Sequence, residues 1–215
     1  MVKIERTPVA PVSLAAEKVK NGSYTQPDVI HQLYKDFQGK CYLCEMDELQ
    51  SAEVEHLTAH RGNVDLKFDW NNLFLSCRHC NSMKNAGKYD MGIIDCCKEE
   101  PEVHLNYTFA GERVDVQAVD CEESTVKTAA LLTECFEKRN TGIRQYTCDV
   151  RVRALKLTMT VLYKTLASYE KGTDAHALEV LKVMLDRSYK FAGFTRAYVR
   201  AHIDTYPELE PYVVL

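Results

Sequence analysis

The sequence has no surplus of positive charge. Its 215 residues include 27 Lys and Arg against 31 Asp and Glu, which gives a formal net charge of −4. Proteins that bind nucleic acid over their whole surface are basic, so this composition excludes a generally basic nucleic-acid binder. Any contact with phosphate must therefore come from a local group of cations or from a partner protein.

Long apolar runs, internal repeats and low-complexity segments are absent as well. No stretch approaches the length that spans a bilayer, and the first six residues lack the apolar core of a signal peptide. We therefore expect a cytoplasmic protein that makes no use of a membrane. With 46% hydrophobic residues, the chain is long enough for one globular body or two small ones.

Cysteine, by contrast, is present in a pattern. Cys41 and Cys44 form one Cys-x-x-Cys pair, and Cys77 and Cys80 form a second. Each pair sets two thiolates about one turn apart, so that four can surround Zn²⁺ as a tetrahedron. The 32 residues between the pairs are more than a compact zinc ribbon contains, so we expect a folded segment there.

The other five cysteines show no spacing typical of a disulfide framework. In a reducing compartment they are most simply free thiols, and the adjacent pair leaves a redox role open as the less common alternative: Cys96, Cys97, Cys121, Cys135 and Cys148.

Between the cysteine pairs the pattern predicts two short strands and a helix. Residues 52–57 read as a strand with Val54 buried, and residues 73–75 read as a second strand after a polar turn at residues 69–72. A helix is expected to open over residues 80–85, capped by Asn or Ser. The predicted order is strand, strand, helix, held together by zinc.

Three groups of residues in this segment resemble a known motif. Glu55-His56-Leu57, then Asn72-Leu73, then Cys77-x-x-Cys80-Asn81-x-x-Lys84 are similar to the four-cysteine form of the HNH (ββα-metal) endonuclease motif. The resemblance covers about residues 38–90, which is under half of the chain. It implies an enzyme that uses a metal ion to hydrolyse phosphodiester bonds in DNA.

The resemblance also implies roles for individual residues. His56 would be the general base that takes a proton from the attacking water, and Asn72 would hold the loop next to it by hydrogen bonds to backbone. Glu55 and Asn81 would bind the catalytic ion. Because Glu55 replaces the more usual Asp or His and Asn81 is neutral, this oxygen-rich pair favours Mg²⁺ or Mn²⁺, while the cysteines hold structural Zn²⁺.

Cations and further histidines lie close to the motif. We expect Arg78, Lys84 and Lys88 to contact phosphate. His60 and His79 are interpreted as phosphate contacts or surface residues, and neither is placed in the metal shell. A zinc-held binding module without catalysis is the alternative, although it leaves the Glu-His and Asn positions unexplained.

The expected fold class is α+β, with the zinc-held motif, a β-hairpin and a mainly helical C-terminal part. Residues 1–25 are predicted to be an extended N-terminal arm, residues 26–100 the HNH nuclease domain, and residues 101–215 the hairpin and helices. The hairpin is expected over residues 104–119, and helices are expected over residues 28–39, 128–138, 150–169, 177–185 and 191–203. Whether the two parts pack as one body is left open.

Basic residues gather in the C-terminal part, where a solvated helix face and a phosphate-tracking surface explain them equally well: Lys138, Arg139, Arg144, Arg151, Arg153, Lys156 and Lys164.

The succession of an arm, the four-cysteine motif and a helical tail that ends in residues 191–198 resembles the HNH subunit of Septu-type anti-phage defence, which is also found beside some retrons. That resemblance implies an ATPase partner of the SMC/ABC-like class in a hetero-oligomeric complex. A stand-alone restriction or homing-type nuclease is the alternative.

Overall fold

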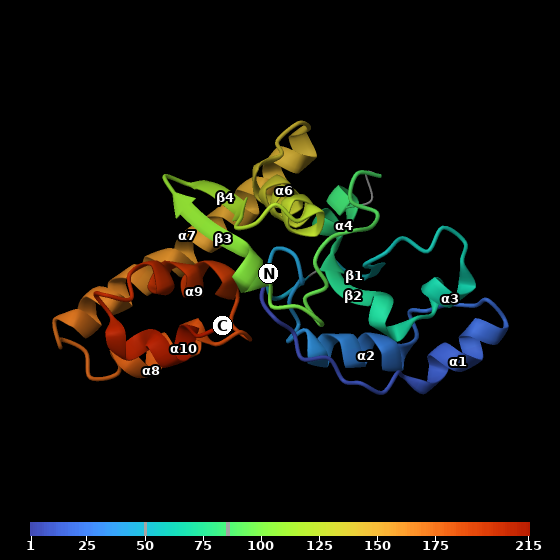
Figure 1. Ribbon diagram of the computed structural model, residues 1–215, viewed down its shortest axis with the longest axis horizontal. Coiled ribbons are helices and arrows are strands. Elements are labelled where there is room, and N and C mark those ends of the chain that lie inside the picture. Colours follow the sequence, from blue (N-terminus) through green and yellow to red (C-terminus); the bar gives the residue numbers. More distant parts are fainter. Residues whose placement is uncertain (50, 85–86) are drawn as a thin grey trace.

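The computed structural model describes residues 1–49, 51–84 and 87–215 (Figure 1). The expected α+β class is confirmed, with a predominance of helix and two separate two-stranded sheets. Figure 1 shows α1 to α3 on one side and α8 to α10 on the other, with α6 and the β3–β4 sheet between them. No helix among the described residues is both long and apolar enough to cross a membrane.

The N-terminal arm is only partly extended, which corrects the prediction. Its first residues pack back onto the chain, where Met1 and Val2 are buried and the amide of Ile4 donates to the carbonyl of Cys96 at 2.9 Å. Helix α1 (Val12–Val19) then forms inside the predicted arm. Its central residues are strong helix formers, and the carboxylate of Asp28 accepts bonds from the amide and hydroxyl of Ser13 in its first turn.

The next elements form the motif that the sequence predicts. Helix α2 (Pro27–Asp36) leads to the first cysteine pair. Strands β1 (Ala52–His56) and β2 (Leu73–Cys77) pair antiparallel, and α3 (Val64–Lys67) and the 3₁₀ turn η1 (Trp70–Asn72) lie between them.

Helix α4 (Arg78–Lys84) follows β2 directly. It therefore begins earlier than predicted, so that Asn81 and Ser82 lie inside the helix and do not cap it. The predicted end of this helix at residue 85 lies outside the described residues.

The C-terminal part begins with α5 (Pro101–His104) and the predicted hairpin, β3 (Leu105–Ala110) and β4 (Arg113–Ala118). Helix α6 (Glu123–Glu137) packs against β4 and α4. Helix α7 is longer than predicted because Thr141 caps it at residue 142, where its hydroxyl accepts a bond from the Arg144 amide. The remaining elements are α7 (Gly142–Glu170), α8 (Ala177–Leu185), α9 (Ala192–Ala201), η2 (Pro207–Leu209) and α10 (Glu210–Val213).

The two parts pack against each other over a shared core. One cluster of buried apolar side chains runs through both, and buried polar contacts join them. Glu45 follows the first cysteine pair and accepts a hydrogen bond from the amide of Gly193, at the start of α9, at 2.8 Å. A Cβ at position 193 would lie 3.2 Å from both this carboxylate and the ring of Tyr107, so glycine permits the close approach.

Candidate metal centre and active site

The two cysteine pairs meet in one buried cluster. Cys41 and Cys44 lie in the turn after α2, Cys77 ends β2, and Cys80 lies in the first turn of α4. The four sulfur atoms lie within 4.8 Å of one another, and the sulfurs of Cys44 and Cys77 are 3.9 Å apart. Zn–S bonds of about 2.3 Å in a tetrahedron set the sulfurs roughly 3.8 Å apart, so the cluster fits zinc with no open position.

Arg151 brings a positive charge to this cluster from α7. Its side chain is buried, and Nη2 donates to the sulfur of Cys77 at 2.9 Å while Nη1 donates to the carbonyl of Thr147 at 2.8 Å. Hydrogen bonds from the other three cysteines, together with the charge of Arg151, lower the pKa of Cys77 and favour a thiolate. The basic C-terminal stretch is explained from sequence either by a solvated helix face or by a surface that contacts phosphate. Arg151 fits neither explanation, because it is buried against Cys77.

His79 is also engaged by the C-terminal part, which corrects its interpretation as a surface residue or phosphate contact. Nε2 donates to the carbonyl of Cys135 at 2.9 Å, and Nδ1 lies 2.8 Å from the hydroxyl of Thr147. Burial lowers the pKa of His79 to about 4, so the ring is neutral near pH 7. His79 and Arg151 therefore join the second cysteine pair to α6 and α7.

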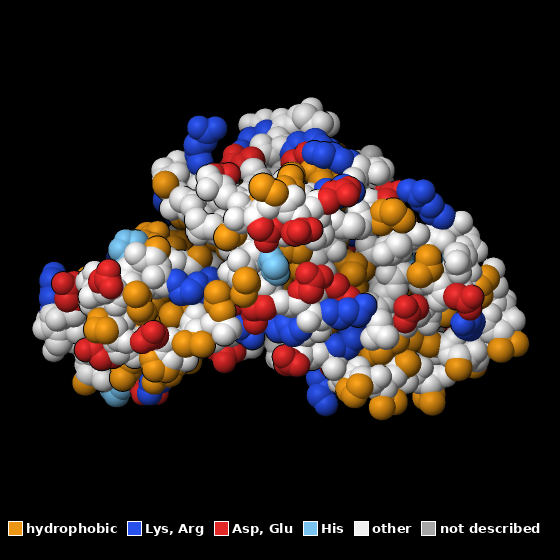
Figure 2. All heavy atoms as spheres, in the orientation of Figure 1, with side chains coloured by type: hydrophobic (Ala, Val, Ile, Leu, Met, Phe, Trp, Pro, Cys, Tyr) orange, Lys and Arg blue, Asp and Glu red, His pale blue; other side chains and the backbone are white. Residues whose placement is uncertain are grey.

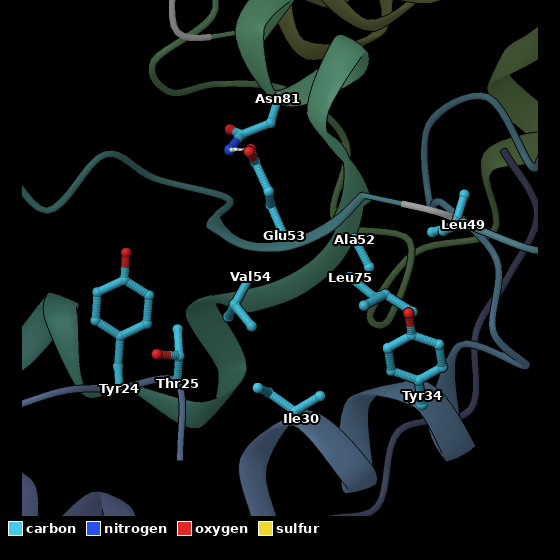
Figure 3. Close-up of a pocket in the computed structure, with 10 residues that line it drawn as sticks. All are labelled: Tyr24, Thr25, Ile30, Tyr34, Leu49, Ala52, Glu53, Val54, Leu75 and Asn81. Atoms are coloured by element: carbon cyan, nitrogen blue, oxygen red, sulfur yellow. Dashed lines mark hydrogen bonds between the residues drawn. The ribbon is translucent and has the colours of Figure 1, made fainter. Parts of the chain in front are cut away.

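One face of β1 lies along α4, and this arrangement pairs their polar residues. The amide Nδ2 of Asn81 donates to Glu53 Oε2 at 2.6 Å, and Figure 3 shows the two side chains pointing toward each other. Glu53 and Glu55 are alternate residues of β1 and therefore share a face of the strand. Asn81 and Lys84 are three residues apart on α4 and share a face of the helix, so Glu55 lies next to Lys84. Lys84 Nζ is 3.3 Å from Glu55 Oε2 and donates to the carbonyl of His56 at 2.8 Å.

The placement of Glu55 differs from the role that the resemblance implies. Its carboxylate is buried and also accepts a bond from the hydroxyl of Tyr42. Burial raises the pKa of Glu55 to about 7, although Lys84 and Tyr42 act in the opposite direction.

Among the residues that the structure describes, Asn81 is hydrogen-bonded to Glu53 and not to Glu55, and sequence reasoning missed Glu53. Its position two residues before Glu55, on the same strand face, was the available signal.

The three cations expected at phosphate have different surroundings. Arg78 is exposed, and its Nε lies 4.0 Å from Glu53 Oε1. Lys88 is exposed and pairs with Glu134 at 3.0 Å. Lys84 is only 1% exposed, so its place beside Glu55 corrects the expectation of a phosphate contact.

Asn72 holds the loop between β1 and β2. Its Oδ1 accepts from the amide of Thr58 at 2.8 Å, and its Nδ2 donates to the carbonyls of Thr58 and Leu66 at 2.9 and 3.0 Å. One buried side chain thus ties together both ends of the loop that follows His56.

His56 ends β1 and faces this loop. Its Nε2 lies 3.0 Å from the carbonyl of Lys67, and its ring packs against the rings of Tyr24 and His60, each with centroids 4.7 Å away. Because a carbonyl only accepts, Nε2 carries the proton and Nδ1 keeps its lone pair. Burial lowers the pKa of His56 below its usual value of 6.5, so the ring is neutral near pH 7. This is the protonation state that a general base requires.

A comparison with protein families agrees with this geometry. Residues 41–87, which are 47 of the 215 residues, match the family model of the HNH endonucleases. A comparison with curated proteins found no match. The segment from residue 41 to residue 87 is an HNH endonuclease domain, and it contains a four-cysteine metal cluster.

Proposed function

We propose that the protein is a metal-dependent endonuclease that hydrolyses phosphodiester bonds in DNA, with Zn²⁺ in the cysteine cluster and Mg²⁺ or Mn²⁺ at the catalytic site. The observation that carries this proposal is the Glu53–Asn81 pair, 2.6 Å apart on the cysteine-held motif that also bears His56.

The donors at this pair suit a hard divalent cation. Glu53 supplies a carboxylate, and the amide of Asn81 presents its oxygen to the same point once it turns over. Mg²⁺ is held by one or two carboxylates and keeps waters that substrate phosphates can replace. Such an ion supplies stabilisation of the negative charge that develops on the phosphorus and the leaving oxygen.

His56 is the general base of this proposal. Its neutral ring accepts a proton from the attacking water at Nδ1, while the carbonyl of Lys67 fixes the tautomer. Asn72 acts as a positioning residue through the loop 57–67. Lys84 acts in the same way through the carbonyl of His56, because it fastens the end of β1 to α4.

The metal pair is tested by Glu53→Gln with cleavage of plasmid DNA in Mg²⁺, in Mn²⁺ and in chelator. Glu179→Gln is the control, because Glu179 is an exposed glutamate on α8 that forms a local ion pair with Lys182. We expect Glu53→Gln to need far more metal for the same rate, whereas the control keeps the wild-type metal dependence. An unchanged metal dependence in Glu53→Gln would remove this carboxylate from the site.

We propose further that the nuclease acts in the cytoplasm within an anti-phage complex of the Septu type, bound to an ATPase partner. The resemblance in the succession of arm, four-cysteine motif and helical tail ending in residues 191–198 supports this assignment. A second support is the solvent face of α7, where a stripe of apolar residues lies open, with Ile143 81% and Leu157 69% exposed. Other exposed members of the stripe are Tyr146 and Val161.

Co-purification of the tagged chain from its host tests the complex. We expect one ATPase subunit to co-purify with the wild-type chain and to be lost from Leu157→Asp. Val180→Asp on α8 is the control at another exposed apolar position. Purification of a fully active nuclease without any second protein would instead favour the stand-alone alternative.

A further inference from the structure

A hollow of about 620 Å³ opens beside the Glu53–Asn81 pair. Its floor is apolar and comes from three elements, with Ile30 from α2, Val54 from β1 and Leu75 from β2 (Figure 3). The volume lies within the range of sites that hold small organic groups. The polar pair therefore closes one side of a space that is otherwise suited to a flat apolar group.

Two tyrosines flank this floor. Tyr24 lies before α2 and also touches the ring of His56, so it borders both the hollow and the proposed base. Tyr34 lies on α2 and is 38% exposed. Figure 3 shows the two rings on either side of Ile30, with both hydroxyls directed to the side on which Glu53 and Asn81 lie. Aromatic rings in such positions stack on nucleobases.

Charge near the pair is too sparse to hold a polynucleotide through its phosphates alone. Arg78 lies beside Glu53, Lys84 is buried against Glu55, and Lys88 pairs with Glu134. Figure 2 shows acidic and basic side chains interspersed over the visible face, and the whole chain carries a net charge of −4. Few counterions are therefore released when a polynucleotide binds to these cations. The affinity of the protein for a polynucleotide must then come largely from contacts with the bases.

We propose that this hollow receives an unpaired nucleobase next to the phosphodiester that is cut, so that the substrate is a single-stranded nucleic acid. This inference rests on the proposed function, because it takes the Glu53–Asn81 pair as the place of the scissile phosphate. In a duplex the faces of the bases are stacked on one another, so a base must leave the stack before it enters the hollow.

Binding of labelled oligonucleotides to the full-length, zinc-loaded protein tests the proposal, with Ca²⁺ in place of Mg²⁺ to hold the site without turnover. The probes are a short single strand, the duplex of the same sequence, and single strands with one abasic position moved along the chain. Each is made as DNA and as RNA, since both present the same base faces. Tyr34→Ala removes one wall, and Ile30→Trp fills the floor.

Tyr163→Ala is the matched control, because Tyr163 is 37% exposed and lies on α7 away from the hollow. All variants are first compared by thermal unfolding and zinc content. We expect the single strand, as DNA or RNA, to bind at least about ten-fold more tightly than the duplex. Tyr34→Ala and Ile30→Trp should each lose about ten-fold for the single strand, and Tyr163→Ala should lose nothing.

The abasic scan gives the sharpest outcome. One abasic position should weaken binding to the wild type by about ten-fold, and it should weaken binding to Tyr34→Ala much less, because the stacking contact is already gone. Equal affinity for both strand forms, or wild-type binding by folded Tyr34→Ala and Ile30→Trp, overturns the inference even when the protein cleaves DNA. Single-strand preference without cleavage in Mg²⁺ or Mn²⁺ instead overturns the proposed function and leaves the hollow as a base site.

Discussion

Replacement of Arg151 by Met should loosen the cysteine cluster. The guanidinium of this α7 residue is buried and donates to the sulfur of Cys77 at 2.9 Å. Four thiolates around a divalent ion carry two surplus negative charges, and in the described residues Arg151 is the cation that hydrogen-bonds to one of these sulfurs. Methionine fills a similar volume but removes the positive charge. The negative charge of the buried thiolates is then no longer balanced by the neighbouring guanidinium.

The expected cost follows from that burial. Removing one member of a buried, hydrogen-bonded charge pair costs about 3–5 kcal/mol. A loss of about 3 kcal/mol corresponds to roughly a hundred-fold weaker hold on zinc. In a chain of this size it also corresponds to a fall of roughly 6–12 °C in the midpoint of thermal unfolding.

Competition with a coloured zinc chelator measures the first quantity, and calorimetry measures the second. Arg153→Met is the control on the same helix, because Arg153 is exposed and, among the residues that the structure describes, donates only to the backbone carbonyl of Asp149. Arg151→Lys should give an intermediate value, since it keeps the charge and loses the planar donor. Wild-type zinc retention and stability in Arg151→Met would refute the assignment of this residue to the cluster.

Three further outcomes are expected. Burial lowers the pKa of His56, so the cleavage rate should rise with pH to a half-maximum below 6.5 and stay level above it; a midpoint above 7 in the pH–rate profile would contradict the buried, neutral base. Asn72→Ala deletes three hydrogen bonds to backbone and should cost about 3 kcal/mol in denaturant unfolding while zinc is retained; full stability would show that the loop is held by other contacts. Duplex DNA should bind weakly to the isolated chain and with a shallow salt slope, because its net charge is −4; tight binding near physiological salt, measured by anisotropy, would show that no partner is needed.

Local patterns were sufficient to predict the framework of the fold. The Cys-x-x-Cys spacing predicts the cluster that the structure brings together, and the alternation on either side of residues 111–112 predicts the β3–β4 hairpin. The stripe Leu155, Met159, Leu162, Leu166 and Tyr169 predicts the inner face of α7, where the first four side chains are buried and Tyr169 is partly buried against the core. Each of these signals is a period in the sequence, which secondary structure converts directly into a face.

The pairing of side chains at the site depends on contacts between elements, which no local pattern gives. The register of β1 against α4 decides that Asn81 meets Glu53 and that Glu55 meets Lys84. From sequence alone, a basic residue on a helix is expected to be exposed to solvent. Lys84 and Arg151 are buried because β1 packs against the first and the cysteine cluster packs against the second. Helix α1 was missed because prolines and an Asn-Gly turn surround it, whereas the Asp28 side chain that supports it lies on the next helix.

The most direct test of the account is cleavage of DNA by His56→Ala beside the wild type, in Mg²⁺ and in Mn²⁺, at low salt and with equal zinc content. Single-stranded and duplex substrates are both included, so that the outcome does not depend on the form of the strand. The account predicts metal-dependent cleavage by the wild type and a loss of about 10²–10⁴-fold in the folded, zinc-loaded variant. Equal rates in the two proteins would contradict a nuclease that uses His56 as its base.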